Sequence, residues 1–238
     1  MKKIILAASI IGIFGTSFVH STEAITNPTP KKTICIDAGH QKKQNLQTEP
    51  IAPGSKVKKA KVTSGTRGVA TKKYEYELNL EVALQLQKAL EKKNFHVVMT
   101  RTKHDVNLSN IDRATICNNA KSALTIRIHA DGSTNKNTQG LSLLYPSGTY
   151  TKSINKTSET IAKTLLTETI RITKAKKGYG DGLVPRSDLT GFNWSKTPVV
   201  LVEMGFMSNA TEDKRLSTKS YQQSIVNGLV NGIVKSVH

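Results

Sequence analysis

The sequence is poor in cysteine and in aromatic residues. Two cysteines in 238 residues exclude a scaffold held together by disulfides and a zinc ribbon built on four cysteines. Aromatic residues make up 5% of the chain, with a single Trp, so little surface is available for stacking on nucleic-acid bases. We therefore expect no nucleic-acid partner.

Acidic residues are also scarce. The chain has 17 Asp and Glu against 35 Lys and Arg, a formal net charge of +18. This excess predicts an anionic partner, and charge alone does not choose among nucleic acid, a membrane surface and an anionic cell-wall polymer. Hydrophobic residues make up 37% of the chain, which is enough for a folded domain with its own core.

Long hydrophobic runs are limited to the N-terminus. Two lysines precede an apolar run over residues 4–18, and the small residues Thr22 and Ala24 follow it. This layout predicts a signal peptide over residues 1–24, because the run is short for a membrane span of about 20 residues. We expect a linker over residues 25–32, one domain over residues 33–238, and a secreted, monomeric protein without stable membrane insertion after cleavage.

Strands and helices alternate along the rest of the chain. This alternation predicts a single α/β domain in which helices flank a mostly parallel mixed sheet. Within the last helix, Tyr221, Ile225, Leu229 and Ile233 recur every four residues. Ser109, followed by Asp112, predicts a capping box. Strands are expected at 33–37, 95–100, 123–129, 140–145 and 198–206, helices at 74–93, 109–120, 154–172 and 217–237, and a loop at 41–73.

The two cysteines lie in apolar surroundings. Export permits a disulfide between Cys35 and Cys117. We expect buried free thiols instead, because cysteine is among the most buried residue types.

Three of the predicted strands end with a residue that can bind a metal or act as a base. His40 follows the first strand, His129 ends another, and Glu203 lies in an apolar run where burial of its charge needs a partner. Ligands bind beyond the carboxyl ends of strands in such sheets. A catalytic zinc site needs a third protein ligand. Spacing alone does not select it from three glutamates near the start of the following helix, Glu75, Glu77 and Glu81.

Four segments of the chain, in this order and spacing, resemble the zinc-dependent N-acetylmuramoyl-L-alanine amidases of the amidase_3 type. The resemblance extends from Thr33 to the C-terminus. The segments are Ile36-Asp37-Ala38-Gly39-His40, then Glu75 with Asn79 four residues later, then Ile128-His129-Ala130-Asp131, and Val202-Glu203-Met204-Gly205-Phe206-Met207-Ser208-Asn209.

The resemblance implies a six-stranded sheet and an autolysin-type hydrolase. Its reaction would cleave the amide bond between N-acetylmuramic acid and L-alanine in peptidoglycan. One Zn²⁺ per chain would be held by His40, Glu75 and His129, and Glu203 would be the catalytic general base. Glu75 is preferred over Glu77 and Glu81 because only it is followed four residues later by Asn.

Two departures from the family pattern concern the substrate groove. Gln41 stands where many members have Gly, and the loop over residues 41–73 is long. Residues 25–73 carry eleven Lys and Arg against two acids. We expect this basic loop to bind teichoic acid or peptidoglycan carboxylates, and the alternative is a solvated loop that only aids solubility.

Other interpretations stay open at this point. The domain could be a zinc peptidase that cuts within the stem peptide, or a non-catalytic protein that binds wall polyanions. Arg127 could contact substrate or form an ion pair. Asn193, in a loop with the only Trp, is a further candidate for substrate binding.

Overall fold

The computed structural model describes Met1 and residues 31–237. The expected signal peptide over residues 1–24 lies outside the described residues apart from Met1, and so does the linker apart from Lys31 and Lys32. Both remain predictions.

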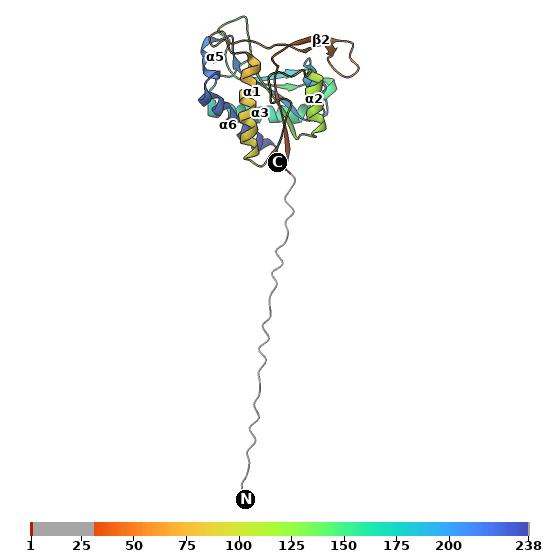
Figure 1. The fold of residues 1–238 in the computed structure, drawn as a ribbon, viewed down its shortest axis with the longest axis vertical. Coiled ribbons are helices and arrows are strands. Elements are labelled where there is room, and N and C mark those ends of the chain that lie inside the picture. The colour runs from red at the N-terminus through yellow and green to blue at the C-terminus, as the bar shows by residue number, and fades with distance from the viewer. Residues whose placement is uncertain (2–30, 238) are drawn as a thin grey trace. The chain divides into compact units, whose positions relative to one another are not determined.

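A six-stranded sheet forms the centre of the domain, with strand order β4-β1-β5-β8-β6-β7 (Figure 1). Its strands pair in parallel, except that β6 runs antiparallel to β8. The predicted α/β fold with a mostly parallel mixed sheet is therefore confirmed. The strands are β1 (Thr33–Ala38), β4 (His96–Met99), β5 (Leu124–Asp131), β6 (Ser142–Pro146), β7 (Leu183–Arg186) and β8 (Val199–Phe206).

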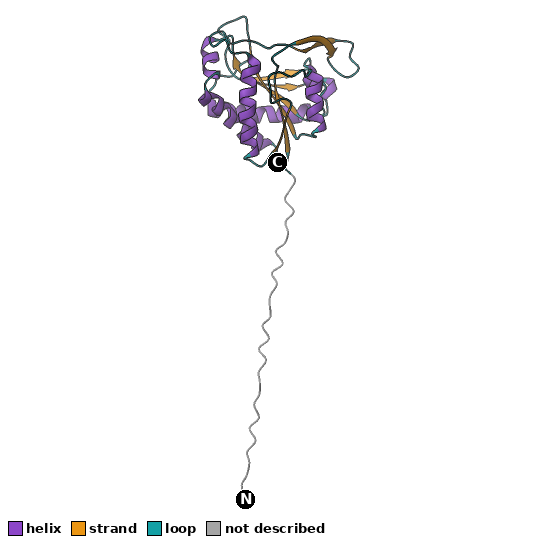
Figure 2. Ribbon diagram, viewed as in Figure 1, coloured by secondary structure: helices purple, strands orange, loops and turns teal. Residues whose placement is uncertain are grey.

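Helices cover both faces of this sheet (Figure 2). The four predicted helices are present, and α4, α5 and a 3₁₀ turn at Thr149–Thr151 were not predicted. None of the described helices is long and apolar enough to cross a bilayer. The helices are α1 (Glu75–Glu91), α2 (Asn110–Asn119), α3 (Asn155–Thr173), α4 (Thr190–Asn193), α5 (Ala210–Leu216) and α6 (Lys219–Ser236).

Alternation along the strands divides the core into two layers. Ile34 and Ile36 of β1 belong to the larger layer, which α1, α3 and α6 share with the sheet. Phe192 of α4 packs with Val199 and Leu201 in a smaller cluster. Residues of β1, β5 and β8 are buried on both faces of the sheet, so the sequences of these strands are nearly continuous apolar runs.

The predicted capping box of α2 is present. Ser109 Oγ accepts a hydrogen bond from the Asp112 amide (3.1 Å), and Asp112 Oδ2 accepts one from the Ser109 amide (2.8 Å). The cap fixes the residue at which α2 begins. The helix packs against β1.

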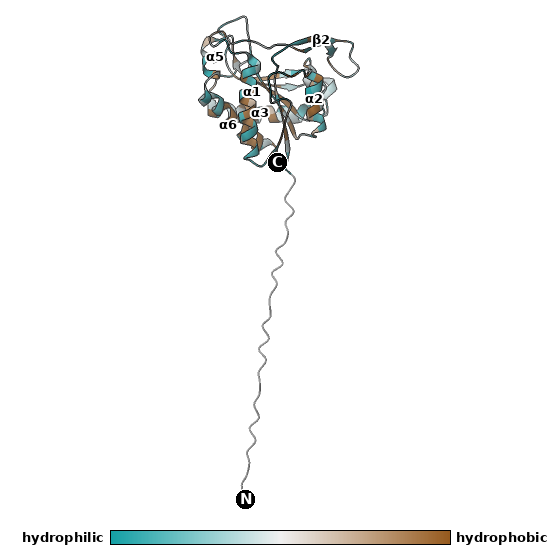
Figure 3. Ribbon diagram, viewed as in Figure 1, coloured by the Kyte–Doolittle hydropathy of each residue, from teal (hydrophilic) through white to brown (hydrophobic). Residues whose placement is uncertain are grey.

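The prediction of a loop over residues 41–73 was wrong in part. An antiparallel hairpin formed by β2 (Asn45–Pro50) and β3 (Lys58–Val62) occupies it. In Figure 3 the helices show both hydrophobic and hydrophilic stretches, whereas β2 is hydrophilic. Because only one residue of each strand is buried, the hairpin lacks the apolar alternation that identifies a strand.

Contacts from the hairpin to the main domain hold it in place. Asn110 Nδ2 donates to the Lys61 carbonyl (2.8 Å), and Trp194 Nε1 donates to the Pro50 carbonyl (3.0 Å). Both donors belong to segments on the α2 and α4 side of the sheet, so the hairpin lies over that side of the domain.

The expectation of free thiols was wrong as well. Cys35 of β1 and Cys117 of α2 form a disulfide, with their Cα atoms 5.4 Å apart. Cys35 alternates with Ile34 and Ile36, so it points away from the larger core layer and toward α2. The disulfide therefore joins the first strand of the domain to the helix that packs against it.

Candidate metal centre

The three predicted metal ligands lie together at the carboxyl edge of the parallel strands. His40 follows β1, Glu75 is the first residue of α1, and His129 lies near the end of β5. Glu75 Oε1 is 3.2 Å from His40 Nε2 and 3.1 Å from His129 Nδ1. One possible ligand atom from each residue lies within 4.8 Å of the others. The three side chains thus face one common point.

The other two glutamates that the sequence left open have different partners. Glu77 accepts a hydrogen bond from the Tyr74 amide at the start of α1 (3.0 Å). Glu81 pairs with Lys73, at 2.7 Å. Only Glu75 faces the histidines.

Backbone contacts orient His40. Its backbone has a φ of 58°, in the left-handed region that side chains seldom occupy. Its Nδ1 lies 2.9 Å from the Thr63 carbonyl, which can only accept, so Nδ1 carries the proton. The Nε2 atom is then left with the lone pair that a metal ligand needs.

Asn79, four residues after Glu75 on α1, connects two of the ligand-bearing segments. Its Nδ2 donates to Glu75 Oε1 and to the Gly39 carbonyl, each at 3.2 Å. One buried amide therefore fixes Glu75 relative to the backbone that carries His40. This contact gives a physical reason for the Glu-x-x-x-Asn pattern that selected Glu75.

Two glycines allow the ligands to pack this closely. A Cβ on Gly39 would lie 2.2 Å from the His129 ring, and a Cβ on Gly65 would lie 2.5 Å from Glu75 Oε2. Gly65 also has a φ of 77°, where glycine is favoured. Both positions exclude a larger residue while the ligands keep this arrangement.

The ionisation of Glu75 and His129 suits a cation, whereas a proton on His40 competes with one. Burial acts against charge on Glu75, but the two histidines outweigh it and hold the Glu75 pKa well below its usual value. Burial lowers the pKa of His129 to about 4, so its ring is neutral at neutral pH. For His40, the Glu75 carboxylate outweighs burial and raises the pKa.

A metal ion fits these residues. His129 Nε2 is buried and has no hydrogen-bond partner within the described part of the chain, which is costly for a polar atom unless a ligand occupies the site. Two imidazoles and one carboxylate are a donor set of catalytic zinc sites, which leave one position open for water or substrate.

Glu203 lies on the strand next to His129. In the pairing of β5 with β8, His129 is opposite Glu203. Glu203 Oε2 is buried without a partner among the described residues. Burial raises the Glu203 pKa well above its usual value, and the carboxylates of Glu75 and Asp131 raise it further. Glu203 is thus a buried carboxyl group that holds its proton more tightly than usual, as suits a general acid–base group.

The metal centre and Glu203 line one hollow of about 520 Å³, called here the first hollow. Its wall is completed by the end of β5 and the residues after it, Asp131 to Thr134, and by Ser208. The arrangement can therefore hold a substrate between a metal ion and a proton-transferring carboxyl group.

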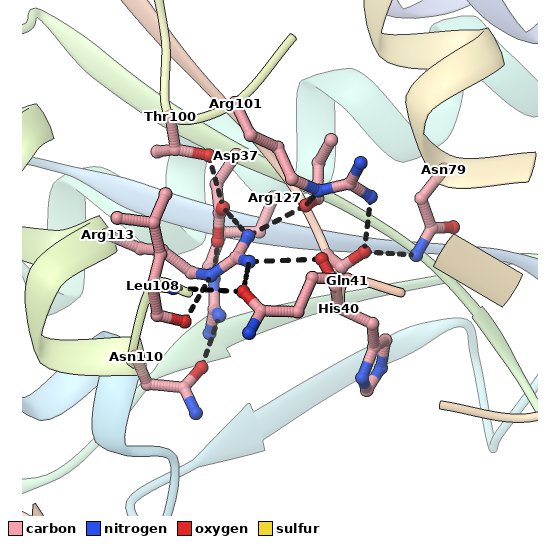
Figure 4. Close-up of polar contacts among 12 residues, drawn as sticks. Asp37, His40, Gln41, Asn79, Thr100, Arg101, Leu108, Asn110, Arg113 and Arg127 are labelled. Carbon is pink, nitrogen blue, oxygen red and sulfur yellow. Dashed lines mark hydrogen bonds and ion pairs between the residues drawn. The ribbon is translucent and has the colours of Figure 1, made fainter. Parts of the chain in front are cut away.

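A buried cluster of charged residues lies beneath the loop of His40 (Figure 4). Asp37 pairs with Arg113 Nη1 through Oδ1 and with Arg127 Nε through Oδ2, each at 2.8 Å. Burial alone would raise the Asp37 pKa, but the two guanidinium groups and the Thr100 hydroxyl hold it far below its usual value. The ion pair considered for Arg127 is therefore present.

Arginines also bind the carbonyls that lead to His40. Arg101 donates to the carbonyls of Ala38 (2.8 Å) and Gly39 (3.0 Å), and Arg113 donates to those of Ala38 (2.8 Å) and His40 (3.0 Å). The left-handed turn at His40 is thus held from below by two guanidinium groups. The segment Val98-Met99-Thr100-Arg101 supports the family resemblance, but sequence reasoning assigned no role to Arg101.

The remaining sequence candidates lie apart from the metal. Gln41 is buried, and its Oε1 accepts hydrogen bonds from Arg113 (3.1 Å) and the Leu108 amide (3.0 Å), so this departure from the family pattern has a structural role. Asn193 ends α4, where its Nδ2 donates to the Ser187 carbonyl (3.1 Å). Its proposed contact with substrate stays a prediction.

The fold and site define an α/β domain with a cluster of two histidines and one glutamate, able to hold a metal ion, at the carboxyl edge of its sheet. The family model of the N-acetylmuramoyl-L-alanine amidases, Amidase_3, matches residues 34–235. The chain belongs to this family.

Individual relatives are more distant. The "Probable cell wall amidase LytH" of Staphylococcus epidermidis is 24% identical over 87% of this chain and 59% of its own length. The chain thus spans less than two thirds of that relative. The one from Staphylococcus aureus is 27% identical with the same coverage.

Solved structures share the fold. The N-acetylmuramyl-L-alanine amidase Ami1 of Mycobacterium smegmatis has a TM-score of 0.78 at 23% identity, covering 87% of this chain and 96% of that one. The N-acetylmuramoyl-L-alanine amidase of Clostridium difficile 630 has a TM-score of 0.70 at 24% identity, covering 87% and 97%.

Proposed function

We propose that this chain hydrolyses the amide bond between N-acetylmuramic acid and L-alanine in peptidoglycan and that it depends on zinc. The observation that carries the proposal is the meeting of His40, Glu75 and His129 beside the carboxyl group of Glu203 in one hollow. Membership of the amidase family supports the choice of this bond over others.

His40, Glu75 and His129 would hold the ion. When bound, zinc supplies a Lewis acid for the scissile carbonyl and lowers the pKa of a water molecule toward neutrality. The two imidazoles bring no charge to the site while Glu75 brings one negative charge, so part of the ion's positive charge is left for the substrate.

Glu203 moves the proton in this mechanism. Its carboxylate accepts a proton from the attacking water and then gives it to the departing amine of L-alanine. A raised pKa suits both steps, because the group must be able to gain and lose a proton near neutral pH.

The bacterial cell wall is the proposed place of action. The predicted signal peptide and the name of LytH as a cell wall amidase support export to it. We also propose that lysines of the β2–β3 hairpin bind wall anions, teichoic acid or peptidoglycan carboxylates. Lys56 and Lys58 are exposed on this hairpin beside the domain's site edge.

Mass spectrometry of digested peptidoglycan tests the function. Purified peptidoglycan is incubated with the zinc-loaded protein and with protein stripped by a chelator and then reloaded. The expected products are intact stem peptides with a free L-alanine N-terminus and unsubstituted muramic acid, formed only with zinc. Fragments cut within the stem peptide would identify a peptidase instead. If no product depended on zinc, a non-catalytic protein that binds the wall would be the remaining interpretation.

A further inference from the structure

A second hollow, of about 400 Å³, adjoins the metal centre. It shares His40 and His129 with the first hollow, so the metal centre opens onto both. Its other walls come from β3, the start of α2, β5 and the loop between β7 and α4. A substrate that reaches the metal through the first hollow can therefore extend into the second.

Arg127 lies in the floor of the second hollow. It is 6% exposed, and two of its three guanidinium nitrogens are bound, Nε by Asp37 and Nη2 by Asn110 at 2.9 Å. Its Nη1 has no hydrogen-bond partner among the described residues. That atom faces the lining residue Gly191, where a Cβ would lie 2.3 Å from it. A buried cationic group thus keeps one donor for a ligand.

Lys59 lies at the rim of the same hollow. Its Nζ binds the Asp188 carbonyl (2.6 Å) and carboxylate (3.1 Å). The Asp188 carboxylate is also bound by Arg186, at 2.7 and 2.9 Å. These linked ion pairs join the hairpin to the loop before α4.

The charges around the second hollow do not balance. Asp37 is shared by two guanidinium groups, Arg113 and Arg127. Asp188 is shared by Lys59 and Arg186. Each carboxylate has two cationic partners, so the ion pairs at the floor and at the rim each contain more positive than negative groups. A hollow with this charge attracts an anion, and the planar guanidinium group suits a carboxylate.

We propose that the second hollow is a subsite for a carboxylate of the substrate, bound between Arg127 and Lys59. The proposal rests on the proposed function, since it takes a peptidoglycan stem peptide as the molecule that carries the carboxylate. The subsite makes the enzyme selective for stem peptides whose carboxyl group at that position is free and not amidated.

Paired substrates test the subsite. Soluble muramoyl peptides are prepared that differ only in one carboxyl group, free or converted to a carboxamide, with one pair for each carboxyl position. We expect kcat/KM to favour the free acid by about tenfold or more at one position, as a charge-assisted hydrogen bond provides. Lys59→Gln should remove most of this preference.

Two variants separate recognition from structural support. Lys92→Gln is the matched control, because it removes the same charge from an exposed lysine at the C-terminal end of α1, which lines neither hollow. It should keep the preference. Asp188→Asn breaks the same ion pair as Lys59→Gln but leaves the lysine, so it should keep or increase the preference. If Asp188→Asn and Lys59→Gln lost the preference for the free acid equally, Lys59 would act only through its structural contact with Asp188.

The subsite and the function fail in different ways. Hydrolysis of every peptide without preference for a free acid would overturn the subsite and leave the amidase proposal in place. Calorimetric binding of the free-acid peptides, with a preference lost in Lys59→Gln but no hydrolysis, would support the subsite and overturn the function. Peptides neither bound nor hydrolysed would overturn both.

Discussion

At the scale of single residues, the metal centre depends on groups that cannot be exchanged without moving a ligand. The His40 ring is oriented by the Thr63 carbonyl, and Glu75 is held by Asn79. The His129 ring lies against Gly39, where a side chain would collide with it. The donor set is thus fixed in advance by its neighbours, which lowers the cost of ordering it around an ion.

His40→Ala should abolish stoichiometric zinc binding. The variant removes one of three protein ligands, and two ligands are too few for a site that keeps an open position. Elemental analysis after gel filtration measures this, with about one zinc per chain expected in the wild type and far less in the variant. His96→Ala is the control, since His96 is exposed on β4. An unchanged zinc content in His40→Ala would show that this ligand is assigned wrongly.

At the scale of elements, the hairpin is the most distinctive part of the domain. It carries exposed lysines and also forms a wall of the second hollow. Its two strands are polar, and contacts such as that of Trp194 with Pro50, at the turn end, hold it against the sheet's α4 side. One element therefore combines surface charge with a boundary of the site.

Replacing four hairpin lysines should weaken binding to cell walls. Lys56, Lys58, Lys59 and Lys61 are each changed to Gln, and sedimentation with purified walls is followed as salt is raised. We expect weaker binding with a smaller dependence on salt, because surface attraction between opposite charges is screened by salt. Zinc content should stay unchanged.

The matched control for that experiment removes the same charge elsewhere. Lys92, Lys93, Lys121 and Lys196 are exposed and lie next to the ends of α1 and α2 or before β8, at the edge where parallel strands begin. The control should bind walls more tightly than the hairpin variant. Equally weakened wall binding in both variants would mean that only total charge matters. Unchanged wall binding in both would indicate that the hairpin lysines serve solubility alone.

The disulfide is the second feature at this scale. It closes a loop between residues 82 positions apart in the sequence. Replacing both cysteines by Ala should lower the free energy of unfolding by about 2–4 kcal/mol, because the unfolded chain regains the freedom that the cross-link removes. Urea unfolding with and without reductant measures this. The reductant should destabilise the wild type only, and an equal effect on the variant would contradict a structural disulfide.

At the scale of the whole molecule, the stability of the fold at low pH depends on the buried charges around Asp37, beneath the His40 loop. The Asp37 pKa is lower in the folded protein than in the unfolded chain. Its contribution to stability is therefore present above the unfolded value of about 3.9 and is lost as the pH falls below it. Asp37→Asn should cost about 3–5 kcal/mol at neutral pH by leaving two buried guanidinium groups with too little negative charge.

Asp188→Asn is the matched control for Asp37→Asn. Asp188 also has two cationic partners, but about half of its side chain is exposed, so the expected loss is under about 1 kcal/mol. Urea unfolding from pH 7 to pH 3 compares the two variants. Asp37→Asn should also flatten the loss of stability below pH 4. Similar costs for both variants would show that burial does not set the strength of the Asp37 cluster.

The sequence predicted the molecule best where burial is strongest. Strands β1, β5 and β8 are apolar throughout because both of their faces are covered, and their ends brought His40, His129 and Glu203 to one edge. The selection of Glu75 needed the family pattern, since its neighbours Glu77 and Glu81 have the same chemistry.

Features made by long-range contacts could not be predicted. The hairpin is exposed on both faces, and the short β7 contains Pro185, so neither shows a strand pattern. The disulfide depends on a Cα separation that sequence does not give. The Asp37 cluster joins residues up to 90 positions apart, and nothing local distinguishes its arginines from surface ones.

The most direct test is the release of stem peptides with a free L-alanine N-terminus from purified peptidoglycan, by the wild type and by Glu203→Gln at equal zinc content. In its proposed role Glu203 is not a ligand of the ion, so the variant should keep its zinc. It should lose turnover by about a hundredfold or more, the usual contribution of a general acid–base group. Turnover by Glu203→Gln at the wild-type rate, or no such peptides released by the zinc-loaded wild type, would contradict the account.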